Sequence, residues 1–156
     1  MSRTVNNYYI LYNNPFLLLD VILEFYRHYE SKQEKELLLS YLILPFTLYE
    51  TSCQALQTTT SKRSIRSFIK EANRLYGLQS RIQEFKTLTN QCLQLAIDEG
   101  YIKIKPGLIV EITQSGRTVE KNNTIEKHIL ASANLAKMLK GGELVSIFRQ
   151  LGIKEL

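Results

Sequence analysis

The chain has 156 residues, a formal net charge of +5 at pH 7, 44% hydrophobic residues and two cysteines. This length suits one domain that buries a core without disulfides, and the composition excludes a disordered or disulfide-stapled protein. The longest apolar run, residues 37–48, is shorter than the roughly 20 residues of a spanning helix, so we expect a cytoplasmic protein without membrane association.

The positive charge is concentrated in one part of the chain. Residues 1–60 carry −2, residues 61–86 carry +5 and residues 87–156 carry +2. A local excess of this kind indicates a local role, such as contact with an anionic partner. We expect a single domain over residues 1–156, with apolar helices in 1–60, helices and a β-hairpin in 61–113, and further helices in 114–156.

The first strong helix signal is Asn14 followed by Pro15, a good N-cap before a residue that suits the first helical position. They predict a helix from Pro15 to about Tyr29. Its apolar side is wide, so this helix is either central to the fold or half-buried in a partner. A second apolar helix is predicted from Glu34 to Leu44, where Pro45 ends or kinks it.

A clear amphipathic pattern predicts a helix from Lys62 to Tyr76. Basic side chains are expected on the face opposite its apolar residues, namely Lys62, Arg63, Arg66, Lys70 and Arg74. Such a row can contact DNA phosphates, since each Lys or Arg replaces a counterion. It can equally meet an acidic protein surface, and the third alternative is a solvated face.

The segment from Arg81 to Thr113 changes from helical to alternating periodicity. Gly100 ends the helix, and Tyr101–Lys105 and Leu108–Ile112 predict two strands joined by a Pro-Gly turn. A helix followed by a tight hairpin predicts a winged-helix ending. The exposed face of this helix is polar and has no central arginine to reach a guanine edge, which favours docking to protein over sequence-specific DNA recognition.

Two more helices are predicted after the hairpin, from Ile125 to about Lys140 and from Glu143 to Leu151. The last one has apolar residues at positions i, i+3, i+4 and i+7, namely Leu144, Ile147, Phe148 and Leu151. This spacing suits a helix that lies in a partner's groove, and it also suits the final layer of the chain's own core. The Gly141-Gly142 pair before it can act as a hinge, which favours docking.

Sequence motifs of catalysis and metal binding do not occur in the chain. We found no Gly-rich phosphate loop, no nucleophile elbow and no metal-ligand spacing, and His28 and His128 are isolated. We therefore expect a protein that is not an enzyme and that has no cofactor or metal. The expected fold class is mainly α (α+β), a winged-helix-like helical domain with one small β-hairpin wing.

Three stretches carry a resemblance to a known family: residues 12–19 (YNNPFLLL), residues 37–45 with residues 58–68, and residues 141–153. The chain resembles the middle component of three-component ABC ATPase systems. That small protein is encoded between an effector and an SMC-like ATPase in prokaryotic conflict loci, including Lamassu-type defence.

The resemblance implies a non-catalytic adaptor subunit. It would sit on the SMC-like ABC ATPase, bridge it to an effector subunit that we expect to be a nuclease, and help the complex to sense double-stranded DNA. The alternative is a stand-alone winged-helix transcription regulator that binds DNA. The neutral face of the helix before the hairpin argues against this alternative.

Overall fold

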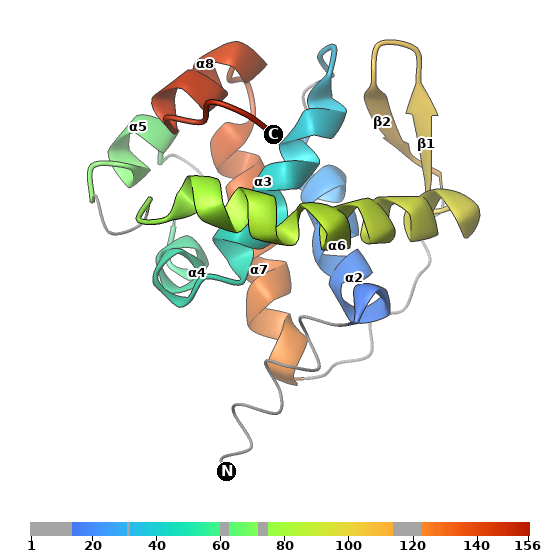
Figure 1. Cartoon of the computed structure of the whole chain (residues 1–156), viewed down its shortest axis with the longest axis horizontal. Helices are drawn as coiled ribbons and strands as arrows, with labels where there is room; N and C mark the ends of the chain where they lie inside the picture. The colour runs from blue at the N-terminus through green and yellow to red at the C-terminus, as the bar shows by residue number, and fades with distance from the viewer. Residues whose placement is uncertain (1–13, 31, 60–62, 72–74, 114–122) are drawn as a thin grey trace.

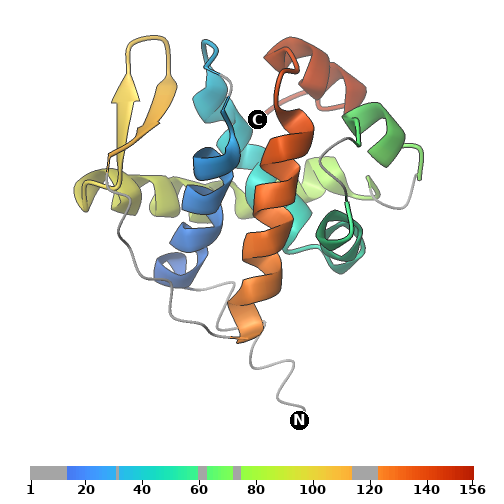
Figure 2. The same cartoon turned by 180° about the vertical axis from the view of Figure 1, so that it is seen from behind.

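The computed structural model describes residues 14–30, 32–59, 63–71, 75–113 and 123–156 (Figure 1). Within these residues the chain is mainly helical with one two-stranded antiparallel sheet, which confirms the predicted α+β class. Helices α2 (Pro15–His28) and α7 (Asn123–Leu139) lie side by side (Figure 2), and α6 (Leu78–Asp98) crosses α2. None of the described helices is long and apolar enough to cross a membrane.

Helix α2 begins where its sequence predicts. The side chain of Asn14 accepts hydrogen bonds from the N–H groups of Phe16 and Leu17, and a proline occupies the first helical position. Most of the apolar side of α2 is completely buried against α6 and α7. The hydroxyl of Ser132 in α7 donates to the carbonyl of Val21 at 2.6 Å. Of the two roles open to this helix, the structure therefore shows the central one.

The second apolar segment is divided differently from the prediction. A 3-10 turn, η1 (Glu36–Leu39), leads into α3 (Ser40–Thr47), and α4 (Glu50–Gln57) follows. Pro45 lies inside α3, which continues to Thr47, so of the two predicted effects Pro45 does not end the helix. The reason is burial: Pro45 and its neighbours in α3 are enclosed by the core, which holds the helix together although one N–H is missing.

The hairpin follows α6 as its sequence predicts, to within one residue. Gly100 has a φ of 75°, and β1 (Ile102–Lys105) pairs with β2 (Ile109–Ile112) in antiparallel register. Gly107 in the turn has a φ of 83°, a conformation that residues with a side chain rarely adopt. The sheet faces the core through Ile102 and Val110, which are 3% and 0% exposed.

The hairpin is held by residues 32–37, which lie at the predicted start of the second apolar helix; we call them the 32–37 clasp. The N–H groups of Lys35 and Leu37 donate to the carbonyls of Gly107 and Leu108 at 2.7 and 3.0 Å. The structure thus confirms the order of helix and hairpin, and it shows the second strand bound along its outer side. The hairpin therefore does not form a wing that projects freely from the domain.

Candidate functional site

The basic segment after residue 62 forms a much shorter helix than predicted. Helix α5 covers Ile65–Phe68, its N-cap Ser64 accepts a hydrogen bond from the N–H of Ser67, and turns follow at residues 69–70. Phe68 is completely buried and meets the ring of Phe46 edge-on. The apolar periodicity correctly marks the side chains that pack, but the tertiary contacts of this anchor override the local helix propensity.

The predicted row of five basic residues is therefore not one helix face. Arg66 lies in α5 and Lys70 in the turn after it, and both are exposed. Arg63 precedes α5, is half-buried and places its guanidinium 5.6 Å from the centre of the Phe68 ring. Lys62 and Arg74 lie outside the described residues. Two exposed cations on one corner of the molecule remain as described candidates for an anionic partner.

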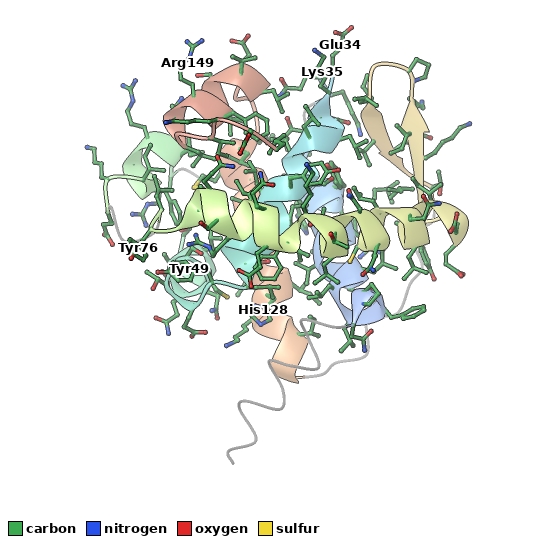
Figure 3. The ribbon with its side chains drawn as sticks, viewed as in Figure 1. Glu34, Lys35, Tyr49, Tyr76, His128 and Arg149 are labelled. Atoms are coloured by element: carbon green, nitrogen blue, oxygen red, sulfur yellow. The ribbon has the colours of Figure 1, made fainter. Side chains whose placement is uncertain are left out.

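Arg81 belongs to the same basic segment but has an internal role that the sequence did not reveal. Its Nε donates to the carbonyl of Pro45 at 3.1 Å, and its guanidinium also bonds to the carbonyl of Tyr76. The guanidinium carbon lies 3.9 Å from the centre of the Tyr49 ring. Arg81 thus joins the start of α6 to the end of α3, and it holds the backbone of Tyr76, whose side chain is 79% exposed at this corner (Figure 3).

The C-terminal helix α8 (Leu144–Gln150) lies over the end of the helical core (Figures 1 and 2). Leu144, Ile147 and Leu151 are 7%, 1% and 6% exposed, and Phe148 is half-buried against the same core. In this structure the predicted docking face therefore closes the chain's own core, the second of the two roles that its spacing allows. Docking of this face on a partner stays a prediction.

The glycine pair before α8 is held rather than free. The side-chain amide of Gln33 donates to the carbonyl of Gly142 at 2.8 Å and accepts from the N–H of Leu144 at 3.1 Å. The same amide donates to the hydroxyl of Tyr29 at 2.7 Å. Gln33 belongs to the 32–37 clasp, so one short segment contacts both the hairpin and the start of α8. Figure 3 shows its neighbours Glu34 and Lys35 between these two elements.

A buried cysteine and a buried histidine lie side by side and form a candidate for reactive chemistry. The Sγ of Cys53 lies 3.6 Å from the Nδ1 of His128, and both residues are almost completely buried. Burial raises the pKa of the Cys53 thiol, and burial lowers the pKa of His128. Nδ1 of His128 donates to the carbonyl of Thr47 at 2.7 Å. Both groups are thus held neutral, the opposite of an activated thiolate and imidazolium pair.

The other histidine forms a surface contact. His28 lies 2.9 Å from the carboxylate of Glu24, one helical turn earlier in α2. Among the described residues, no group of three or more histidine, cysteine or acidic side chains is arranged to hold a metal ion.

Comparison with known proteins gives one match. The family model described as "ABC-three component (ABC-3C) system Middle Component 3" matches residues 2–155, which is nearly the whole chain. No match was found among curated proteins, and none among solved structures.

Proposed function

Since the chain belongs to the ABC-three component (ABC-3C) system Middle Component 3 family, we propose that it is a non-catalytic adaptor subunit. In this proposal it bridges an SMC-like ABC ATPase and an effector subunit within a Lamassu-type defence complex against phages and plasmids. The observation that carries the proposal is the family match, which extends from residue 2 to residue 155.

The shape of the molecule supports a bridging role. An adaptor needs two separate contact surfaces held at a fixed distance. The corner with α5 and the β-hairpin lie at opposite ends of α6 (Figure 1), and this helix is 21 residues long. At 1.5 Å per residue, α6 separates the two ends by about 30 Å. The two ends of α6 are therefore separate surfaces at a fixed distance from each other.

Contact with double-stranded DNA is part of the proposal and is assigned to the corner with α5. Arg66 and Lys70 are exposed there, and Arg63 lies beside them over the Phe68 ring. The face of α6 offers no such chemistry, since its central exposed residues, such as Asn90 and Gln94, are uncharged. The proposed contact is therefore with the phosphate backbone and does not depend on base sequence, which disfavours a sequence-specific transcription regulator.

The direct test is assembly with the other two components of the same system. We expect the chain to co-purify with both the ABC ATPase and the effector when the three are co-expressed, and we expect deletion of its gene to remove protection against phage. Isolated ATPase and isolated effector, mixed without this chain, serve as the control for bridging. A stable ATPase–effector complex in that control, with full protection in the deletion strain, would contradict the proposal.

A further inference from the structure

The two edges of the hairpin differ, and the difference begins at Val110. Its N–H donates to Oε1 of Glu36 at 2.8 Å, and its carbonyl accepts from Nζ of Lys32 at 2.9 Å. Both main-chain groups of Val110 therefore point away from β1. In an antiparallel pair, residues that face each other alternate between those that exchange hydrogen bonds and those that do not. Val110 and its partner Ile104 therefore form a pair that exchanges no hydrogen bonds.

The same alternation fixes the outer edge of β1. Because Ile104 exchanges no bonds with Val110, its N–H and carbonyl point away from β2, and so do those of Ile102, two residues earlier. The bond from the N–H of Thr113 to the carbonyl of Tyr101 fits this alternation. No described residue donates to or accepts from the main chain of Ile102 or Ile104 on that side. Figures 1 and 2 show β1 on the outer side of the hairpin, with β2 between it and the segment that leads into α3.

One edge of the sheet is thus covered and the other is open. On the β2 side, the side chains of Glu36 and Lys32 take up both outward groups of Val110, and the main chain of the 32–37 clasp bonds to the carbonyls of Gly107 and Leu108 just before the strand. The edge of β1 offers two N–H and two carbonyl groups to an extended segment. Soluble proteins usually cover or blunt such an edge, because it readily pairs with another strand.

We propose that β1 receives an added strand from another component of the ABC-three component system, so that the hairpin becomes a three-stranded sheet. This inference rests on the proposed function, which supplies the partner. Addition of a strand to an exposed edge is a common mode of peptide recognition: main-chain hydrogen bonds give affinity, and alternate side chains give specificity.

The side chains beside the open edge define the chemistry of that strand. On the solvent face, Lys103 and Lys105 are exposed next to the edge, whereas Glu111 lies on the far strand and pairs with Lys105. On the core face, Ile104 is half-buried and adjoins the buried Ile102. A matching strand alternates acidic and apolar residues, with the acidic ones opposite the two lysines. A second copy of β1 would set lysine against lysine, so the same charges disfavour self-pairing.

The clasp also lowers the cost of binding. Because main-chain and carboxylate bonds fix β2, the hairpin is already ordered before a partner arrives. A rigid edge loses little conformational freedom on association, so more of the interaction energy appears as affinity. At Val110 the β2 edge cannot compete for the same strand, since both outward groups of this residue are already bonded.

The test is a pair of proline substitutions in the co-expressed three-component complex. Ile104→Pro removes one donor from the open edge without removing a bond between β1 and β2, because this N–H points outward. Ile112→Pro is the matched control: it changes another half-buried isoleucine and removes an outward donor from the β2 side. We expect Ile104→Pro to weaken binding of one component by about tenfold or more, since it leaves a partner group unsatisfied, and Ile112→Pro to retain it.

A second variant keeps the backbone intact. Lys103→Gln with Lys105→Gln, both at exposed positions, should weaken binding of the same component and make it less sensitive to salt. Amide hydrogen exchange should slow at Ile102 and Ile104 when the complex forms. If the complex forms with unchanged exchange at these amides, and Ile104→Pro binds as tightly as Ile112→Pro, the strand proposal is wrong while the adaptor role stands. If the unmodified chain binds neither component, both proposals fail.

Discussion

The carboxylate of Glu36 accepts a hydrogen bond from the main-chain N–H of Val110 at 2.8 Å, across 74 residues of sequence. Both residues are completely buried. Water is therefore not available as a replacement partner, and a buried N–H without an acceptor costs about 1–3 kcal/mol. This bond fixes the hairpin to η1, with the further contacts of Lys32 and the N–H of Leu37 on either side.

Substitution of Glu36 tests that role. Glu36→Ala should lower the free energy of unfolding by about 2 kcal/mol or more, because it leaves the buried N–H of Val110 without an acceptor. Glu36→Gln is the matched control, since its amide oxygen can still accept that bond. It should lower the free energy of unfolding by less than Glu36→Ala does. Urea denaturation of both variants measures the difference. Equal losses for the two variants would show that the carboxylate charge, and not the bond to Val110, stabilises the hairpin.

His128 should make the protein less stable in mild acid. Its Nδ1 donates to the carbonyl of Thr47, so a second proton must bind Nε2, which is buried and has no hydrogen-bond partner among the described residues. Burial therefore lowers the pKa of His128, although the bond to Thr47 opposes this. The unfolded chain then binds more protons below about pH 6.5, the ordinary histidine pKa, and stability falls as the pH decreases through this range.

The measurement is the free energy of unfolding between about pH 7.5 and pH 5.5, where few carboxylates titrate. The glutamine in the His128→Gln variant can still donate to the carbonyl of Thr47 but cannot titrate. The stability of this variant should therefore change less with pH than that of the unmodified protein. The unmodified protein, measured in the same buffers, is the reference. A His128→Gln variant with the same slope would rule out this histidine as the source.

The C-terminal helix should behave as part of the core. Ile147 is 1% exposed, so Ile147→Ala should cost about 2–5 kcal/mol of stability. Val145 in the same helix is 57% exposed, and Val145→Ala should leave the melting temperature almost unchanged. Calorimetry of the two variants separates the roles of α8. If Ile147→Ala melts like Val145→Ala but fails to bind a partner, α8 is a docking helix and not a core element.

The corner with α5 should contribute to DNA affinity in the assembled complex. Changing Arg66 and Lys70 to glutamate should weaken binding to double-stranded DNA and reduce the salt slope by about one for each lost phosphate contact. Changing Lys137 in α7 and Lys140, just after this helix, to glutamate makes the same change in net charge at another surface and serves as the control. Identical salt slopes for the two double variants would show that α5 has a solvated basic face.

The elements that the sequence predicted well depend on local chemistry. Asn14 and Pro15 start α2 because the cap and the missing N–H act within one turn of helix. Gly107 sits in the hairpin turn because the required positive φ restricts the residue type at that position. Such signals need no knowledge of the rest of the chain, and they locate element boundaries to within a residue or two.

The features that the sequence did not predict depend on contacts between distant segments. Gln33 and Glu36 lie just before and within the start of the helix predicted from Glu34, yet they bind Gly142 and Val110, which follow many residues later. From the sequence, Arg81 belongs to the basic segment 61–86 and is expected at the surface. In the structure it bonds to the carbonyl of Pro45 and lies over an aromatic ring. The predicted helix over 62–76 failed for the same reason, since Phe68 is anchored by Phe46.

The pairing of α2 with α7 also constrains when the protein can fold during its synthesis. The apolar face of α2 leaves the ribosome early, but α7, including Ser132, is made more than a hundred residues later. At about 10 residues per second, the nascent chain exposes this face for about ten seconds. A growing chain that ends after the hairpin still lacks the helix that covers α2. We therefore expect the part of α2 that α7 covers to stay exposed on the nascent chain until α7 has emerged.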